Sequence, residues 1–301
     1  MAAERGKFLP RMAGLSAEAA RGDFGFPKED MHKVHIDHRT SLIKENMARI
    51  KHKILVMSNK GGVGKSTIAV NFAALSAAAG KRTGLLDIDI HGPSVARMTG
   101  REGRPHTVTG QTIDPLEVMP NLKMISMGSI IGEGGSPVIW RGPLKLAVLR
   151  QFLSDVNWGD LDALIIDAPP GTGDEPLTIC QLIPEMAGAV VVTTGQAVAL
   201  LDSRKAVNFL KQVGIPVLGI LENMAAFNCP HCSKEIDLFK TGGGRRAAEE
   251  MGVPFLGSVP FDPAMVDAGD GGKVYALENA AAPASAAIKA AFDTMLSGVR
   301  K

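Results

Sequence analysis

The sequence predicts an α/β fold built on a doubly wound, mostly parallel sheet flanked by helices. From residue 53 onward, short continuous apolar runs of strand length are separated by amphipathic segments of helix length, which is the order that βαβ units produce. A glycine-rich turn joins the first apolar run to the next helical segment, and this arrangement is typical of a phosphate-binding loop. Connections in such a sheet are right-handed, so we expect ligands beyond the carboxyl ends of the strands.

Seven buried strands are expected in chain order, with helices between most of them. They are residues 53–58, 82–89, 122–128, 162–170, 187–195, 215–224 and 254–261. The Ala-rich tail at residues 279–296 predicts a closing helix after Pro283. Its few large apolar residues argue against an amphipathic membrane anchor.

The first 52 residues differ in character from the rest of the chain. Small, charged and turn-forming residues alternate there without clear periodicity until residues 41–50, which can form one helix. We therefore expect residues 1–52 to be an N-terminal extension that is partly disordered or loosely docked. The globular domain is expected at residues 53–301.

Three histidines, His32, His35 and His38, are spaced three residues apart in this extension. A metal site and a solvated histidine-bearing linker are both compatible with the spacing. The linker is favoured because no cysteine or carboxylate cluster completes a ligand set.

Charge and composition exclude several classes of protein. The chain has a net charge of +2, but residues 1–53 hold 11 Lys and Arg against 7 Asp and Glu, which leaves 22 against 24 for the remainder. The main domain therefore lacks the basic excess of a nucleic-acid-binding domain, and only the extension could act as a basic arm. The longest apolar runs fall far short of the ~20 residues that span a bilayer. We expect neither nucleic acid nor membrane as a partner.

The cysteine content indicates the compartment. Three cysteines are an odd number in a chain of 301 residues and do not make a disulfide framework. No N-terminal apolar segment resembles a secretion signal. A reducing, cytoplasmic environment is expected.

The glycine-rich turn has the features of a P-loop, so the domain is predicted to be a P-loop NTPase. Gly61, Gly62 and Gly64 allow backbone N–H groups to turn toward phosphate oxygens, and the positive end of the following helix dipole faces the same point. Lys65 can reach the β- and γ-phosphates, and the Ser66 hydroxyl can ligate Mg²⁺. ATP and Mg²⁺ are the expected ligands, and Val63 and Thr67 complete the nucleotide-binding segment.

The loop departs from the usual pattern at one position. The motif G-x-x-x-x-G-K-[ST] has glycine where this chain has Asn59. Asparagine tolerates the left-handed backbone conformation better than most residues, so we expect the turn to survive the substitution.

Lys60 narrows the class of NTPase. The segment "KGGVGKST" resembles the deviant P-loop of the ParA/MinD/Mrp class of ATPases. In that class the extra lysine reaches across a homodimer to the phosphates of the partner's nucleotide. The resemblance implies a catalytic role for Lys60, beside Lys65, and a dimer with nucleotide at its interface. A solvated basic residue beside an anion is the plainer interpretation of Lys60.

Two acidic residues end the second predicted strand. Asp87 and Asp89 alternate by two and point to the same side of an extended strand. Hydrolysis at a γ-phosphate needs a group that orients the attacking water, and the resemblance to the first switch of this class gives that catalytic role to Asp89. Asp87 either supports the magnesium shell or is a hydrogen-bond acceptor at the strand end.

A third acidic residue ends the strand at 162–170. Asp167 follows four apolar residues in the manner of a Walker B strand, and its carboxylate can hold a magnesium-bound water. Gly171 and Gly173 leave the next loop free to turn N–H groups toward a γ-phosphate, as a second switch does. Asp174 is expected to cap a helix that starts near Pro176.

Three further blocks together resemble the Mrp/ApbC type of iron–sulfur cluster carrier ATPase. They are "DAPPGTGDEPLT", "VIWRGP" at residues 138–143 and "ENMAAFNCPHC", and the likeness covers about residues 53–298. It implies that Asn223 recognises the adenine edge and that Pro260 lies near the base. A strand-end turn is the structural alternative for Asn223. Some carriers of this family have an N-terminal segment with four cysteines, and this extension has no cysteine.

Cys229 and Cys232 form a C-x-x-C pair, which is half of a four-ligand site. A two-fold axis between two subunits would bring four thiolates together around one metal centre. The spacing suits iron–sulfur and zinc equally, and the family resemblance favours a [4Fe–4S] cluster. His231, between the two cysteines, is not taken as a ligand, and Cys180 is expected to be a packed core thiol.

The sequence therefore predicts a homodimeric ATP hydrolase that receives an iron–sulfur cluster from scaffold proteins and passes it to apo-proteins. A ParA/MinD-like positioning ATPase shares the P-loop, but the C-x-x-C pair and the modest charge of the main domain argue against it. A dimer with a purely structural zinc is the other alternative.

Overall fold

The computed structural model describes residues 28–89, 92–110, 112–127, 142–229, 231–232, 234–237 and 239–299. Its strands are β1 (Ile50–Met57), β2 (Thr83–Asp87), β3 (Val108–Thr109), β4 (Thr112–Ile113), β5 (Leu116–Met119), β6 (Leu122–Ser126), β7 (Leu161–Asp167), β8 (Gly188–Thr193), β9 (Val217–Ala225), β10 (Phe227–Asn228), β11 (Glu235–Ile236) and β12 (Phe255–Pro260). Its helices are α2 (Lys28–Ala48), α3 (Lys65–Ala78), α4 (Val95–Met98), α6 (Gly142–Asp155), α7 (Asp174–Leu182), α8 (Ala197–Gln212), α9 (Gly243–Met251), α10 (Pro263–Asp270), α11 (Tyr275–Glu278) and α12 (Pro283–Gly298).

The main sheet has eight strands in the order β12-β9-β8-β1-β7-β2-β6-β5. All seven predicted strands are present, and they pair in parallel with one another. The eighth strand, β5, was not predicted and pairs antiparallel with β6 at the sheet edge. The doubly wound, mostly parallel α/β fold is confirmed.

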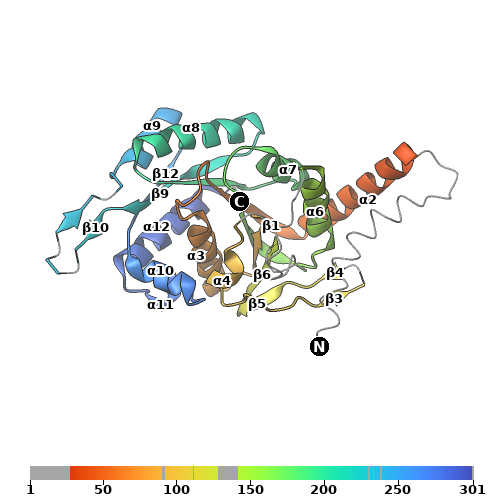
Figure 1. Ribbon diagram of the computed structural model, residues 1–301, viewed down its shortest axis with the longest axis horizontal. Coiled ribbons are helices and arrows are strands. Elements are labelled where there is room, and N and C mark those ends of the chain that lie inside the picture. The colour runs from red at the N-terminus through yellow and green to blue at the C-terminus, as the bar shows by residue number, and fades with distance from the viewer. Residues whose placement is uncertain are drawn as a thin grey trace.

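The two faces of the sheet bury two separate apolar cores. Successive residues of a strand point to opposite faces, and in β7 Leu164 and Ile166 lie in one core while Ile165 lies in the other. Helices α2, α6, α7, α8 and α9 cover the first face, and α3, α4, α10, α11 and α12 cover the second (Figure 1). The continuous apolar runs of the sequence result from burial on both sides.

Helix α2 brings part of the predicted extension into the first core. Ile43 and Met47 are fully buried there, and the Asn46 side chain donates a hydrogen bond to the carbonyl of Ser154 in α6. The buried Lys53 ammonium donates to the carbonyls of Met47 and Ile50, which lie at the junction of α2 and β1. The predicted boundary at residues 52 and 53 thus falls inside β1, because that strand begins at Ile50.

The closing helix begins at Pro283, as predicted, and packs against β12 and α3. Its N-terminal proline is favourable there because the first turn needs no N–H donor from that residue. No helix in the described part of the chain has an apolar stretch long enough to cross a bilayer.

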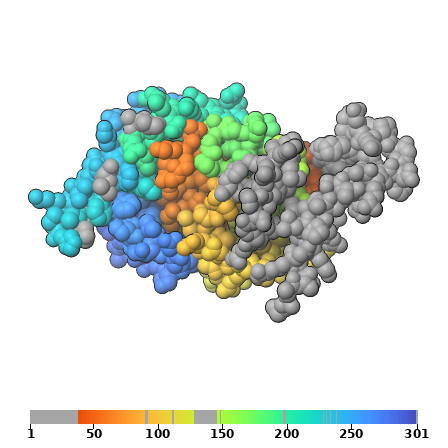
Figure 2. All heavy atoms as spheres, in the orientation of Figure 1, coloured from red at the N-terminus to blue at the C-terminus, as the bar shows by residue number. Residues whose placement is uncertain are grey.

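A small hairpin of β10 and β11 carries the C-x-x-C pair and projects from the body of the molecule (Figures 1 and 2). It follows β9, whose carboxyl end lies at the same sheet edge as those of β1, β7 and β2, because these strands are parallel. The candidate nucleotide site and the cysteines are therefore on the same side of the fold.

Candidate active site

The P-loop connects β1 to α3, as predicted. Gly62 and Gly64 have φ angles of 78° and 80°, a left-handed conformation that favours glycine. Gly64 is the residue immediately before α3, and a Cβ atom built on it would lie 2.1 Å from Nδ2 of Asn223. Gly61 and Gly62 are exposed, and a Cβ atom added at either would meet no described atom within 4 Å. The loop is thus open to solvent at Gly61 and Gly62 and tightly packed against Asn223 at Gly64.

The P-loop turn is intact with Asn59, as expected, but for a different reason from the one expected. Asn59 is absent from the described non-glycine residues with positive φ, so the turn does not use the tolerance of asparagine for left-handed conformations. Its Nδ2 atom instead donates a hydrogen bond of 2.9 Å to Oδ1 of Asp202 in α8. The start of the P-loop is therefore tied to a helix that the sequence did not connect with it.

Lys65 lies at the first position of α3 and forms a buried ion pair with Asp167. The distance between Lys65 Nζ and Asp167 Oδ1 is 2.6 Å, and the side chains are 7% and 0% exposed. The ammonium also donates to the Ser66 hydroxyl at 3.2 Å. The two halves of the predicted site, P-loop and Walker B strand, are in direct contact.

The second oxygen of Asp167, Oδ2, is buried and has no hydrogen-bond partner among the described residues. A buried carboxylate oxygen without a partner is unfavourable unless another ligand or water satisfies it. Together with the nearby Ser66 hydroxyl, it is the hard oxygen donor set that Mg²⁺ prefers. The residues present therefore fit a magnesium ion.

Asp87 lies beside Asp167, since the two are register partners on β2 and β7. Its Oδ2 accepts a 2.8 Å hydrogen bond from the Ser126 hydroxyl, and its Oδ1 accepts from the Asp89 N–H at 3.0 Å. Burial and the neighbouring Asp167 carboxylate raise the pKa of Asp87 to about 7. Asp87 is thus a hydrogen-bond acceptor at the strand end, one of the two roles predicted for it.

Asp89 is also buried, at 8% exposed, and accepts a hydrogen bond from the Gly92 N–H through Oδ1. Asp87, Asp89 and Asp167 lie together at one edge of the sheet, because β2 and β7 are adjacent parallel strands.

The predicted second switch loop starts directly after Asp167. The Gly171 N–H donates a 2.8 Å hydrogen bond to the carbonyl of Ser58, and Gly171 has a φ of 102°. The loop therefore contacts the P-loop backbone. Asp174 was expected to cap α7, but the cap position is occupied by Gly173, and Asp174 lies in the first turn, where its charge favours the helix dipole.

Asn223 connects the end of β9 to the P-loop. The residue is 2% exposed, and its side-chain Nδ2 donates a 2.9 Å hydrogen bond to the Val63 carbonyl. The next residue, Met224, has a φ of 53°, which is unusual for a residue with a side chain. In a regular strand, Asn223 and Met224 would point to opposite faces of the sheet. The break in strand geometry at Met224 allows both of them to line one cavity.

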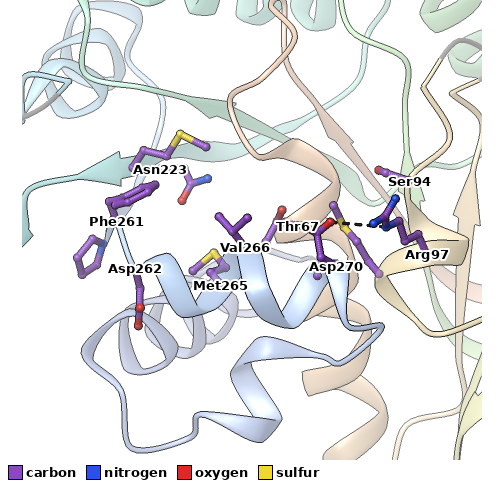
Figure 3. Close-up of a pocket in the computed structure, with 13 residues that line it drawn as sticks. Thr67, Ser94, Arg97, Asn223, Phe261, Asp262, Met265, Val266 and Asp270 are labelled. Carbon is purple, nitrogen blue, oxygen red and sulfur yellow. Dashed lines mark ion pairs between the residues drawn. The ribbon is translucent and has the colours of Figure 1, made fainter.

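That cavity has a volume of about 230 Å³ and lies beside the first turn of α3 (Figure 3). Its lining combines Thr67 with Asn223 and Pro260, three residues that were predicted to bind nucleotide. The volume is below the ~300 Å³ at which sites for drug-sized ligands begin. The cavity therefore has room for a part of a nucleotide, such as its base.

Several lining residues were missed by the sequence reasoning. They come from α4, α10 and the residue after β12, and they include Arg97, Phe261, Met265, Val266 and Asp270. Arg97 and Asp270 form an ion pair of 3.5 Å across the rim, which Figure 3 shows as a dashed line. Of these five, only Phe261 lies in a segment that the sequence analysis singled out, and the packing of α4 against α10 brings the other four together.

Cys229 and Cys232 lie at the tip of the β10–β11 hairpin. The Cys229 N–H donates to the Lys234 carbonyl at 2.9 Å, and Cys232 is exposed. Hydrogen bonds from the N–H groups of His231 and Cys232 lower the pKa of the Cys229 thiol. These hydrogen bonds thus favour the thiolate form of Cys229, which is the form that binds metals.

Within the described residues, no group of three or more His, Cys, Asp or Glu side chains could hold a metal ion. One chain presents two thiols at the hairpin tip. Cys180 lies elsewhere, packed partly against the first core, and burial raises the pKa of its thiol to about 11. It was correctly predicted to be a core thiol.

Some predicted features lie in other parts of the chain or outside the described residues. Lys60 is exposed at the outer edge of the P-loop. His38 is exposed on α2, whereas the side chains of His32 and His35 are outside the described part. Residues 138–141 of the "VIWRGP" block are also outside it.

Comparison with known proteins agrees with this geometry. Residues 49–296 match the family model of the ParA-type NUBPL iron-transfer P-loop NTPases. An iron–sulfur cluster carrier protein from Methanocaldococcus jannaschii is 50% identical over 230 residues, which are 76% of this chain and 79% of that protein. The cytosolic Fe–S cluster assembly factor CFD1 from Saccharomyces cerevisiae is 45% identical over 228 residues, 74% and 78% of the two chains.

Among solved structures, a nucleotide-binding protein from Archaeoglobus fulgidus in complex with ADP is 36% identical, with a TM-score of 0.68. The match covers 78% of this chain and 92% of that chain. The cell division ATPase MinD from Pyrococcus furiosus is 19% identical with a TM-score of 0.57, over 82% and 98% of the chains, which shows a shared fold. The chain belongs to the ParA-type family of NUBPL iron-transfer P-loop NTPases.

Proposed function

We propose that this protein is an ATP-dependent iron–sulfur cluster carrier. It hydrolyses ATP at the P-loop, holds a cluster on the cysteine hairpin and passes it to apo-proteins. The observation that carries this proposal is the position of both features on one side of the sheet, with the C-x-x-C hairpin following directly from the strand that ends in Asn223. The names of the relatives support the same function.

The nucleotide is held by the segment from Gly61 to Thr67. Backbone N–H groups of this loop and the N-terminus of α3 bind the phosphates. Lys65 leaves its ion pair with Asp167 and neutralises the β- and γ-phosphates. Ser66 and Asp167 would hold Mg²⁺, which neutralises charge on the phosphate oxygens when bound.

Hydrolysis requires a water aligned with the γ-phosphate. Asp89 orients this water, because it lies at the same edge as Asp167 and is held by its hydrogen bond from Gly92. Gly171 supplies a backbone N–H to the γ-phosphate after it leaves the Ser58 carbonyl. Asn223 and Pro260 line the cavity for the adenine base.

The working form is a homodimer. Each chain supplies two thiols, and a closed cluster or zinc site takes about four protein ligands. Two hairpins related by a two-fold axis satisfy that number. The exposed Lys60 reaches across the same interface to the partner's nucleotide.

The carried group is a [4Fe–4S] cluster, received from scaffold proteins and delivered in the cytoplasm. Thiolates bind zinc as well, so the group needs direct identification. Anaerobic reconstitution with iron and sulfide, followed by absorption and Mössbauer spectroscopy with iron counted per dimer, makes that identification.

The matched control uses the third cysteine. The double variant Cys229→Ala, Cys232→Ala should take up no cluster, whereas Cys180→Ala should take up as much as the wild type because Cys180 packs against the core. A wild type that acquires no more cluster than the double variant contradicts the carrier function. Zinc retained in place of iron in anaerobic preparations supports the structural-zinc alternative.

A further inference from the structure

Phe261 contacts two parts of the molecule, the candidate base cavity and the base of the cysteine hairpin. Phe261 lines the cavity together with Asn223 and Pro260 (Figure 3). The ring also packs against Phe227 and Phe239, with centroid distances of 5.8 and 6.5 Å. Phe261 therefore contacts both the candidate base site and the aromatic residues at the base of the cysteine hairpin.

Each of the two legs of the hairpin has one aromatic ring packed against Phe261. Phe227 is the first residue of β10, two positions before Cys229, and Phe239 lies on the returning leg after β11. The Phe261 N–H also donates to the carbonyl of Ala226 at 3.3 Å. A displacement of the Phe261 ring therefore affects both legs where they leave the body.

The segment beyond the returning leg is held rigidly to the sheet. The buried Glu222 carboxylate accepts hydrogen bonds from the N–H groups of Gly242 at 3.0 Å and Gly244 at 2.5 Å. A Cβ atom on Gly195 would lie 1.5 Å from the Lys240 carbonyl oxygen, so two backbones are in close contact there. Movement is thus confined to the hairpin and its aromatic root.

The hairpin itself offers little resistance to movement. Its two strands pair through Phe227 with Ile236 and Asn228 with Glu235. The described residues from His231 to Asp237 are exposed. Short, exposed elements with few buried contacts are the parts of a fold that rearrange at low free energy.

We propose that Phe261 is a positioning residue through which occupancy of the base cavity sets the orientation of the Cys229–Cys232 hairpin. A purine that fills the cavity packs on one side of the ring, and the ring transmits the change to Phe227 and Phe239. Coupling is reciprocal, so a metal on the cysteines alters nucleotide affinity by the same factor. The inference rests on the proposed use of this cavity for the base of ATP.

The test measures thiol reactivity in the full chain without metal. The rates at which iodoacetamide alkylates Cys229 and Cys232 are followed by peptide mass spectrometry, with and without saturating ADP. Wild-type rates should change about fivefold or more on ADP binding, the lower end of usual coupling. Cys180 gives an internal reference of slow reaction because its thiol has a raised pKa.

Phe227→Leu is the informative variant because Phe227 contacts Phe261 but does not line the cavity. It should bind ADP within about twofold of the wild type, and its alkylation rates should no longer respond to ADP. Val266→Ala is the matched control, since Val266 lines the cavity and is 56% exposed on α10. This control should keep the response at saturating ADP.

Rates that ignore ADP in the wild type, or a full response in Phe227→Leu, would overturn the inference. If Phe227→Leu does not fold, Phe239→Leu takes its place. It should likewise bind ADP but lose the ADP response of the alkylation rates, and a full response in it would likewise overturn the inference. Cluster uptake is scored separately by reconstitution. A cluster without an ADP response refutes only the coupling, and an ADP response without a cluster refutes only the carrier function.

Discussion

The ammonium of Lys65 lies 2.6 Å from the carboxylate of Asp167, and both side chains are buried. This ion pair holds Lys65, the lysine proposed to bind phosphate, against the Walker B strand. Nucleotide phosphates that bind Lys65 must therefore take the place of the Asp167 carboxylate as its anionic partner. The Lys65 ammonium thus has a negatively charged partner both before and after nucleotide binds.

Lys65→Met should lower ATP turnover by at least about 100-fold, because the charge that faces the transferred phosphoryl group is lost. It should also lower the free energy of unfolding by about 3 kcal/mol, because Asp167 is left buried without its partner. Phosphate release and urea unfolding measure the two effects. Adding Asp167→Asn should restore stability and not turnover, and unchanged hydrolysis in Lys65→Met would remove the assigned role.

Asp87 should make stability depend on pH in the absence of Mg²⁺. Its pKa is raised from 3.8 to about 7, so between these values the folded state binds a proton that the unfolded state releases. The free energy of unfolding therefore falls as pH rises from about 4 to 7. Asp87→Asn should flatten this part of the profile and stabilise the protein above pH 7 by about 1–3 kcal/mol.

Ser126→Ala provides the control for that pH profile. The Ser126 hydroxyl stabilises the Asp87 carboxylate through its 2.8 Å hydrogen bond. Removing it should raise the pKa of Asp87 further and move the end of the window to higher pH. Urea midpoints measured across pH 4 to 9 distinguish the three proteins, and a wild-type profile that rises between pH 4 and 7 contradicts the prediction.

Gly64→Ala should weaken ADP binding and stability together. The position has a φ of 80°, and the new methyl group would meet Nδ2 of Asn223. Gly80→Ala is matched, since its φ is 79° and a Cβ atom there meets no described atom within 4 Å. It should cost about 1 kcal/mol of conformational strain without changing ADP affinity in titration calorimetry. Equal behaviour of the two variants would mean that the contact with Asn223 is unimportant.

Asn59→Gly restores the usual P-loop residue and removes the hydrogen bond to Asp202. We expect a loss of about 1 kcal/mol in the free energy of unfolding and weaker ADP binding, because the loop start is no longer tied to α8. Asp202→Ala should have the same effect, and the double variant should be no worse than either single one. Fully additive losses would show that the two side chains act independently. Lys205→Ala, which removes the 3.5 Å ion pair to Asp202, is the control.

Features set by local pattern could be predicted from the sequence. The seven parallel strands are apolar on both faces, and glycine, lysine and aspartate stand at strand ends in a fixed order, so β1, β7 and Asp167 followed directly. The antiparallel edge strand β5 was missed because "LEVM" is short and half exposed, with no apolar run. Edge strands need only one neighbour and leave a weak pattern.

Features set by tertiary contact could not be predicted. Ile43 and Met47 lie in the helix that was predicted at residues 41–50, but that helix was assigned to a loosely docked extension, and only its packing against α6 reveals them as core residues. The bond between Asn59 and Asp202 spans 143 residues. The role of Met265 in the cavity depends likewise on how α10 packs against α4.

The hairpin that carries Cys229 and Cys232 is a self-contained insertion between β9 and α9, because Phe261 contacts both of its legs and Glu222 anchors the segment after it. The segment that carries the two cysteines is thus separable from the P-loop domain proposed to bind nucleotide. A variant in which a tight turn replaces the β10–β11 hairpin should therefore keep the fold of the P-loop domain and its nucleotide site. Conversely, if the hairpin holds the metal as proposed, the hairpin and the aromatic residues at its base are the minimal part to transplant into another ATPase of the same fold.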